Sequence, residues 1–540
     1  MDRGPIPESV VVTTTSEPDE LRLARKQHWV NHVARHAFER GGLTAIVFGD
    51  RRITWAELQQ RVVAVSAALA ERGVGRGDRV ALLMGNQAEY IEIMIAANRL
   101  GAIAVPINFR LSVEEVAFTL DNSGSAVLFV DESAGATGIG AAAAAESQVL
   151  VVEVGGGDDS ADGTTPYDVL LAHAGVGAAV VEVDEAESAL LMYTSGTTGR
   201  PKGAVLTHRN LAAQSATNVM AFRIEMHDEV SLCAAPLFHI GTLGLVAPSI
   251  LMGATMVVLP SISFDAGTFL DVAERERVTS TFLVPTQWQA VCDEQERTPR
   301  DLSRLRVSSW GAAPASDTLL RRMAEVLPGS SSLALFGQTE MSPVTCVLEA
   351  KDSRRKLGSV GRPVPGVWAR VVDSEMVDVQ PGEVGEIVYR GPGLMSGYWN
   401  NPEATAEAFA GGWFHSGDLV RMDDEGFIYV VDRAKDMIIS GGENIYCAEV
   451  ENALAGHPDI AEVAVVGRDH ERWGETPVAV VSLKQGAADL TIEALRSWAG
   501  ERLARYKLPT DLVVVDALPR NASGKVIKNT LRAPAATLPA

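Results

Sequence analysis

The sequence predicts an α/β protein with a large N-terminal domain of mixed, largely parallel sheets, a small β module and a small α+β C-terminal domain. Three observations lead to this prediction. Strands and helices alternate over residues 54–130, short strands between Gly-rich turns fill residues 358–431, and a compact mixed region follows residue 433. A domain has about 150 residues, so a chain of 540 residues is too long to form one compact domain.

The first region alternates helix and strand. Thr54 and Glu57 form a capping-box pattern, and an apolar helical face follows until Gly73. The pattern then predicts a strand over 79–84, a helix over 90–100, a strand over 103–106, a helix over 112–120 and a strand over 126–130. This alternation favours a parallel sheet that is covered on both faces. Residues 134–146 and 155–165 are rich in Gly, Ala and Asp, so we expect surface loops there.

A second α/β region is expected over residues 206–336. Within it, residues 230–264 contain no Asp, Glu, Lys or Arg. A membrane-spanning helix needs about 20 apolar residues, but Pro236, Pro248, Pro260 and several glycines interrupt this segment. We therefore predict a buried strand, loop, helix and strand. No membrane span is expected, and peripheral contact with a membrane stays open.

The C-terminal region is expected to mix helices and strands. The pattern predicts a helix near 449–454, strands near 463–466 and 477–483, a helix near 492–503 and a further strand. The sequence has no internal repeat. A large domain up to about residue 432 and a small C-terminal domain follow from this division.

Charge and cysteine content exclude several classes of protein. The formal net charge is −22, whereas a general nucleic-acid binder is expected to be basic. The four cysteines are scattered, which argues against a disulfide scaffold or a zinc site and fits a reducing cytoplasm. Residues 1–20 lack the apolar segment of a signal peptide, so we expect a cytoplasmic protein.

The densest local motif is YTSGTTGRPKG over residues 193–203. Its glycines let the backbone approach a ligand closely, and successive N–H groups can form an anion-binding nest. Ser195, Thr197 and Thr198 add hydroxyl groups, and Lys202 adds a positive charge. The spacing differs from a Walker A loop, because Lys202 is followed by Gly. The motif predicts a phosphate-binding loop of another kind.

Four further motifs follow in order: FGQTE over 336–340, HSGD over 415–418, DRAKD over 432–436 with SGGENI over 440–445, and PRNASGK over 519–525. Together with the loop, they resemble the adenylate-forming superfamily of acyl-CoA synthetases, peptide-synthetase adenylation domains and luciferases. The resemblance covers about residues 30–532, and actinobacterial fatty-acid–CoA ligases are the most similar in overall impression. Phe336, Ser416 and Cys447 replace the family's usual Tyr, Thr and Pro.

The resemblance implies a reaction and a division of the chain. The expected reaction is ATP- and Mg²⁺-dependent activation of a carboxylate to an acyl-adenylate, followed by transfer to CoA with release of AMP and pyrophosphate. It implies a polar tail over 1–25, an adenylation domain over 26–432, a hinge over 433–436 and a mobile C-terminal domain over 437–540. Because the attack on the α-phosphorus gathers negative charge, catalysis depends mainly on positioning and electrostatic stabilisation.

The resemblance also assigns roles residue by residue. The expected nucleotide- and CoA-binding residues are Thr194, Ser195, Gly196, Thr197, Thr198, Gly199, Lys202, Gly311, Ala312, Ala313, Phe336, Gly337, Asp418, Arg433, Lys435, Gly441 and Gly442. Among these, Asp418 and Arg433 are expected at the ribose, Lys435 at the hinge, and Gly441 and Gly442 along the pantetheine tunnel. The expected catalytic residues are Lys525, Glu340, Thr339 and His239, with Glu340 and Thr198 as metal ligands. Lys525 would bridge the carboxylate and the α-phosphate.

The expected acid is apolar. The candidate wall residues offer no cation for a second carboxylate: Phe238, Ile240, Leu243, Leu245, Val284, Trp288, Trp310 and Phe336. No Asp follows the PLFHIG segment to hold an amino group. A fatty acid is the first expectation and an aryl acid the alternative, with Trp310 expected to narrow the pocket floor.

Two other functional classes stay open. The chain could load acyl-AMP onto a carrier protein, although no phosphopantetheine serine motif follows in the sequence. It could also be a non-catalytic nucleotide-sensing scaffold, against which the intact Lys202, Glu340, Asp418 and Lys525 argue. A homodimer is neither predicted nor excluded.

Overall fold

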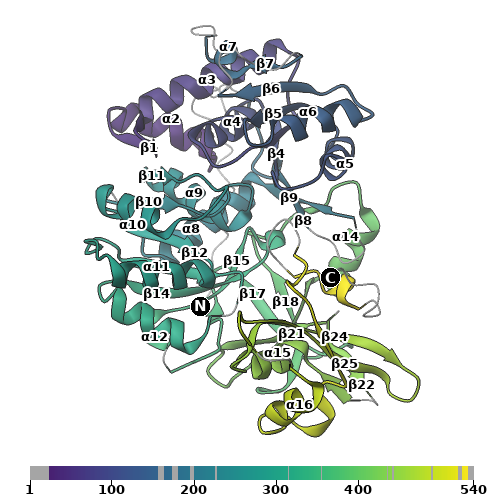
Figure 1. The fold of residues 1–540 in the computed structure, drawn as a ribbon. Coiled ribbons are helices and arrows are strands. Elements are labelled where there is room, and N and C mark those ends of the chain that lie inside the picture. The colour runs from purple at the N-terminus through teal and green to yellow at the C-terminus, as the bar shows by residue number, and fades with distance from the viewer. Residues whose placement is uncertain are drawn as a thin grey trace, which may run out of the picture.

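The computed structural model describes residues 24–155, 163–172, 181–194, 200–225, 228–313, 315–353, 355–434, 436–440, 443–487, 490–520 and 526–532. Two large sheets lie one above the other in Figure 1, and a four-stranded sheet and a C-terminal sheet lie below them. The predicted α/β class and the order of a large and a small domain are confirmed.

The eight-stranded sheet has the order β19-β9-β8-β4-β3-β5-β6-β7 and is parallel from β8 to β7. Its strands are β3 (Arg79–Leu83), β4 (Ile103–Ile107), β5 (Ser125–Asp131), β6 (Leu150–Val154), β7 (Thr165–Pro166), β8 (Ser188–Thr194), β9 (Lys202–Thr207) and β19 (Gly397–Tyr398). Its helices are α3 (Trp55–Glu71), α4 (Ala88–Arg99), α5 (Val113–Ser123), α6 (Gly135–Ala144) and α7 (Tyr167–Leu171). Alternate residues of β3 and β5 pack with α3, α4 and α7 on one face and with α5 and α6 on the other. Both faces are covered, as predicted.

The nine-stranded sheet has the order β16-β15-β14-β13-β12-β10-β11-β1-β2. Its strands are β1 (Thr44–Phe48), β2 (Arg51–Thr54), β10 (Val230–Cys233), β11 (Thr255–Val258), β12 (Ser280–Leu283), β13 (Val307–Gly311), β14 (Ser331–Gly337), β15 (Val344–Leu348) and β16 (Arg362–Pro363). Its helices are α2 (Trp29–Arg40), α8 (His208–Ala221), α9 (Ile240–Met252), α10 (Ala266–Arg275), α11 (Pro285–Arg297) and α12 (Asp317–Val326). The six central strands are parallel.

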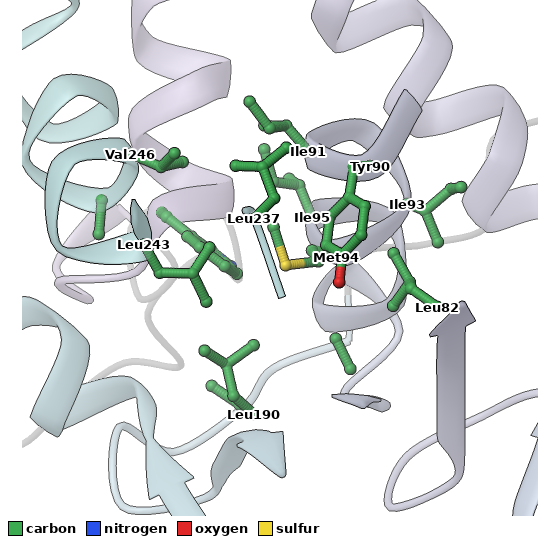
Figure 2. Close-up of a cluster of buried hydrophobic side chains, with 14 of the residues drawn as sticks. Leu82, Tyr90, Ile91, Ile93, Met94, Ile95, Leu190, Leu237, Leu243 and Val246 are labelled. Atoms are coloured by element: carbon green, nitrogen blue, oxygen red, sulfur yellow. The ribbon is translucent and has the colours of Figure 1, made fainter. Parts of the chain in front are cut away.

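The main hydrophobic core joins the two large sheets. Figure 2 shows side chains of α4, among them Met94 and Ile95, beside Leu237 and the α9 residues Leu243 and Val246. All of these side chains are buried. The two sheets therefore share one apolar interior, and the loop that carries Leu237 is anchored in it.

The small β module is the four-stranded sheet β17-β18-β20-β21, which is antiparallel throughout. It consists of β17 (Trp368–Val372), β18 (Val384–Arg390), β20 (Phe414–Met422) and β21 (Ile428–Arg433), and α14 (Pro402–Ala408) precedes β20. The C-terminal sheet contains β22 (Ile438–Ser440), β23 (Glu443–Ile445), β24 (Ile460–His470), β25 (Gly474–Leu483) and β26 (Asp511–Val514). Its helices are α15 (Cys447–Ala455), α16 (Ile492–Gly500) and α17 (Lys528–Leu531).

The predicted local signals are largely confirmed. The Thr54–Glu57 capping box is formed, and the segment after Val230 is strand, loop, helix and strand. Within the described residues, no helix is both long and apolar enough to cross a membrane.

One element was predicted wrongly. The expected surface loop at 134–146 contains α6, because its alanines are strong helix formers. A Cβ at Gly138 would lie 2.3 Å from a methyl group of Val130, so the small residues let α6 approach β5 closely. Gly138 and Ala141 are buried, whereas Ala136, Ala143 and Ala144 are exposed.

Candidate active site

Most predicted site residues of the large domain follow the carboxyl ends of parallel strands, where open α/β sheets bind ligands. In the nine-stranded sheet, β10 leads to His239, β13 ends at Gly311 and β14 ends at Gly337. In the eight-stranded sheet, β8 ends at Thr194. The predicted residues thus lie along one edge of each sheet.

Glu340 joins these two edges. It is buried in a short 3-10 helix, Thr339–Met341, directly after β14. Its Oε1 accepts hydrogen bonds from the hydroxyls of Tyr398 at 3.0 Å and Thr194 at 3.4 Å. Its carbonyl oxygen accepts a bond from the N–H of Met395 at 2.8 Å. Side chain and backbone together fix the position of this carboxylate.

Backbone pairing brings a cation to the same place. Thr194 pairs with Lys202 across β8 and β9, and Tyr398 on β19 pairs with Ala204 on β9. The Nζ of Lys202 lies 5.3 Å from the centre of the Tyr398 ring. Burial, and then the charge of Glu340, raise the pKa of Tyr398, so its hydroxyl stays protonated and donates a hydrogen bond to the carboxylate.

The carboxylate of Glu340 is suited to a hard cation. Carboxylate oxygens are the ligands that Mg²⁺ prefers. Both hydroxyl contacts use Oε1, so among the described residues Oε2 is left for a metal ion. Thr339, the neighbouring residue, is partly exposed. This donor set fits a magnesium ion, which the Glu340 carboxylate would hold.

Gly337 allows the chain to turn tightly before Glu340. A Cβ on Gly337 would lie 1.9 Å from the carbonyl oxygen of Pro343, so only glycine fits this close approach. Ala312 and Ala313 follow β13 and are exposed. Because β13 and β14 are adjacent, these two residues lie beside this turn. The expected nucleotide-binding residues 311–313 and 336–337 therefore lie side by side.

Asp418 and Arg433 form an ion pair in the β module. They oppose each other across β20 and β21, and Arg433 Nε lies 2.6 Å from Asp418 Oδ1. Only 4% of the Asp418 side chain is exposed, against 43% for Arg433. A buried acceptor beside a partly exposed donor is suited to a diol such as a ribose.

Two buried side chains connect this pair to the end of β14. Thr345 Oγ1 donates to the carbonyl oxygen of Phe336 at 3.1 Å and lies 3.3 Å from the hydroxyl of Tyr389. Burial raises the pKa of Tyr389, and the charge of Asp418 adds to this rise. The β module is thus coupled to the strand that leads to Glu340.

The expected acid side surrounds the start of α9. His239 is the N-cap residue of α9, and its Nδ1 accepts a hydrogen bond from the N–H of Gly241 at 3.2 Å. The ring of Phe282 on β12 lies between two glycines. A Cβ on Gly241 would be 3.5 Å from this ring, and a Cβ on Gly311 would be 3.3 Å from it. Phe282 therefore fills the space between α9 and the end of β13.

The expectation for Trp310 was wrong. Trp310 pairs with Leu283, and both pack with α10, α11 and α12. Phe282, the neighbour of Leu283, packs with Leu245 of α9 on the opposite face of the sheet. Trp288 also belongs to the cluster of Trp310. Trp288 and Trp310 thus pack on the face of the sheet opposite α9 and do not line the α9 side.

Several predicted residues lie outside the described residues: Ser195, Gly196, Thr197, Thr198, Gly199, Lys435, Gly441, Gly442 and Lys525. Conversely, the structure adds Tyr398 and Phe282, which no sequence motif indicates. Tyr398 lies in a Gly-Tyr-Trp segment and Phe282 in a short buried strand that also contains Ser280 and Thr281. Neither carries a local signal, because each acts through a contact distant in sequence.

Comparison with known sequences assigns the chain. The sequence model of AMP-binding enzymes matches residues 33–399, and that of the AMP-binding enzyme C-terminal domain matches residues 449–525. The chain belongs to the AMP-binding enzyme family. The resemblance based on the motifs is confirmed.

Three curated relatives cover most of this family member. A feruloyl-CoA synthase of Amycolatopsis is 42% identical over 91% of this chain and 95% of its own length. An indoleacetate–CoA ligase of Aromatoleum aromaticum is 39% identical, with 93% and 97% covered. A long-chain-fatty-acid–CoA ligase of Mycobacterium tuberculosis is 36% identical, with 89% and 93% covered. All three are acid–CoA ligases.

A solved structure shares the fold. O-succinylbenzoate coenzyme A synthetase of Bacillus subtilis, in complex with ATP and magnesium ion, superposes with a TM-score of 0.82 at 33% identity. The match covers 93% of this chain and 99% of that one. The acyl-CoA synthetase-like fold is therefore shared over nearly the whole length.

Proposed function

We propose that this chain is an AMP-forming acid–CoA ligase that activates an aromatic carboxylic acid. It uses ATP with Mg²⁺ to form an acyl-adenylate with release of pyrophosphate, and then transfers the acyl group to the CoA thiol with release of AMP. The observation that carries the proposal is the buried Glu340, held by Tyr398 and Thr194 beside Lys202. This arrangement suits a nucleotide–metal complex at the edges of two sheets.

The described residues divide the work of binding. Lys202 supplies a positive charge next to the phosphates, and Thr339 offers a hydroxyl to the α-phosphate. Asp418 accepts hydrogen bonds from the ribose while Arg433 donates to it. Mg²⁺, when held by Glu340, neutralises phosphate charge. Preorganised charges of this kind lower the barrier because they need no rearrangement during the reaction.

Residues 195–199 complete the phosphate loop in this proposal, with Thr198 as a second metal ligand. Lys525 bridges the carboxylate and the α-phosphate, so Lys525→Ala should reduce adenylation about 100- to 1000-fold. Conversion of a premade acyl-adenylate to the thioester should be spared. Equal loss of both half-reactions would remove Lys525 from this role.

The second half-reaction depends on rotation of the C-terminal domain about the hinge over 433–436. Gly441 and Gly442 line the path of the CoA thiol. Hinge residues change their backbone angles, so Lys435→Pro should leave adenylation measurable and abolish CoA transfer. Thioester formation at an unchanged rate would refute the hinge assignment.

An aromatic acid is favoured over a fatty acid by Phe282. Its ring fills the space between Gly241 and Gly311. In this proposal, the ring limits how deep an acyl group can enter beside His239. A flat ring needs less depth than a long chain. The feruloyl and indoleacetate relatives, at 42% and 39% identity, support this order. A fatty acid is the second candidate, because the mycobacterial relative is 36% identical.

One assay tests the proposal. The purified chain is incubated with ATP, Mg²⁺ and either ferulate, indoleacetate or fatty acids of several lengths, with and without CoA, and products are identified by mass spectrometry. We expect aromatic acyl-CoA and AMP. Fatty acyl-CoA alone would support the second candidate, and acyl-AMP that persists with CoA would support a carrier-loading ligase. No turnover with any acid would contradict ligase activity.

A further inference from the structure

The turn that carries Asp418 is a bulge in the β module. Across β18 and β20, Glu386 pairs with Leu419 and Val388 pairs with His415. Ile387 on β18 therefore lies opposite three residues, 416–418, on β20. Bulges of this kind re-aim side chains and are frequent next to active sites. Here the bulge determines where the Asp418 carboxylate points.

Hydrogen bonds hold the bulge from within. Ser416 Oγ donates to the carbonyl oxygen of Ile387 at 2.5 Å and accepts a bond from the N–H of Asp418 at 3.0 Å. Gly417 has a φ of 70°, a left-handed conformation that glycine adopts without strain. Its carbonyl oxygen accepts a bond from the N–H of Ala434 on the far side. The bulge is therefore tied to both neighbouring strands.

Glu386 contacts the bulge with both carboxylate oxygens. Its Oε1 accepts a hydrogen bond from the N–H of Gly417 at 2.8 Å, and its Oε2 lies 2.8 Å from Nδ1 of His415. The other ring nitrogen of His415 lies 3.2 Å from the carbonyl oxygen of Ala410. One carboxylate thus holds the residue before the bulge and the glycine inside it. Hydrogen bonds to a charged acceptor are about twice as strong as neutral ones.

We propose that Glu386 is a positioning residue for nucleotide recognition: it fixes the bulge so that Asp418 meets the ribose hydroxyls. Glu386 does not touch the nucleotide in this proposal and acts through Gly417 and Asp418. The inference rests on the proposed function, because it assumes that Asp418 binds the ribose. A residue that only supported the fold would affect every nucleotide equally.

The test compares ATP with 2′,3′-dideoxy-ATP, which lacks both ribose hydroxyls. Pyrophosphate release is measured with the preferred acid for the unaltered chain, Glu386→Ala and Glu386→Gln. We expect Glu386→Ala to lower kcat/KM for ATP about tenfold, the effect of about 1.4 kcal/mol, and to leave kcat/KM for dideoxy-ATP nearly unchanged. Glu386→Gln should recover part of the loss, since its amide oxygen still accepts from Gly417. The KM of the acid should not change.

Asp418→Asn is measured in parallel to separate the two claims. If Asp418→Asn penalises ATP more than dideoxy-ATP but Glu386→Ala penalises both equally, the positioning role is refuted and the ribose role stands. If Asp418→Asn also fails to discriminate, the ribose assignment falls and the inference falls with it. Should Glu386→Ala not fold, Glu386→Gln decides by the same ratio, and an unchanged ratio overturns the proposal.

Discussion

The two sides of the candidate site are built differently. On the nucleotide side, polar groups are fixed by strand pairing: Thr194 opposite Lys202, and Asp418 opposite Arg433. On the acid side, Phe282 packs in an apolar cluster with Leu245 of α9, and its ring lies beside Gly241 and Gly311. Backbone register sets the first side, whereas side-chain volume sets the second.

This difference predicts how each side responds to mutation. A buried polar group that loses its partner costs about 1–3 kcal/mol and more when it is charged. A change of volume in an apolar pocket shifts substrate preference by about 1–3 kcal/mol without removing the chemistry. Mutations on the nucleotide side should therefore reduce the turnover of every acid. Mutations on the acid side should instead change which acid is preferred.

Glu340→Gln should have the largest effect. The amide keeps the size of the carboxylate but loses its charge toward Mg²⁺, so we expect adenylation to fall about 100- to 1000-fold for all acids. Acid-dependent pyrophosphate release measures this step. Glu403→Gln, at an exposed position in the first turn of α14, is the matched control. A loss confined to one acid would contradict this division of the site, because Glu340 would then belong to the acid side.

Tyr398→Phe should have the next largest effect. It removes a hydroxyl 3.0 Å from Glu340 Oε1 but keeps the ring near Lys202. A hydrogen bond to a charged group contributes about 1.5–3 kcal/mol, so kcat/KM should fall about 30-fold. A higher Mg²⁺ requirement, measured by metal titration, should accompany the loss. An unchanged metal requirement would show that Tyr398 does not act through Glu340.

The sequence predicted the nucleotide side better than the acid side. Glu340, Asp418 and Lys202 stand in dense motifs. Strand pairing fixes Asp418 and Lys202, and hydrogen bonds fix Glu340. Tyr398 and Phe282 were not selected, because a hydroxyl contact over 58 residues or a ring between two glycines leaves no local pattern. The prediction for Trp310 failed because of side-chain direction. Trp310 and Gly311 are neighbours on β13, but successive residues of a strand face opposite sides of the sheet.

The fold shows the same limit. Alternation of strand and helix predicted covered parallel sheets, yet it did not predict that β1 pairs with β11 in the second sheet. Sheet neighbours depend on contacts distant in sequence, whereas caps and periodicity are local. The Ala-rich α6 was misassigned for a related reason, since Gly138 allows a close contact with Val130 that composition does not reveal.

Asn86 provides a polar anchor on the acid side, where the other described contacts are mainly apolar. Its buried amide accepts from the N–H of Leu237 at 2.7 Å and donates to the carbonyl oxygen of Ala235 at 2.8 Å. The loop that leads to His239 is thereby held. Asn86→Leu leaves two buried backbone groups unpaired, so kcat/KM for the acid should fall about tenfold, with little change in the KM of ATP.

Stability must be measured beside these kinetics, because the unpaired groups also weaken the fold. Asn86→Asp keeps the acceptor for Leu237 and should fall between the unaltered chain and Asn86→Leu. If the KM of ATP rises as much as that of the acid, then Asn86 supports both sides and the division between them is too sharp.

Phe282→Ala should have the smallest effect on total activity and the clearest effect on preference. Removal of the ring opens space between α9 and the end of β13, so kcat/KM for a long fatty acid relative to an aromatic acid should rise about tenfold. Leu283→Ala is the matched control, because Leu283 is buried on the opposite face of the same strand. It creates a comparable cavity away from α9 and should lower stability without altering the ratio. If both variants change the ratio equally, cavity formation in general explains the effect. If the kcat/KM ratio changes only in Phe282→Ala, the preference is assigned to this ring. The side-chain volume that faces α9 then decides which acid is accepted.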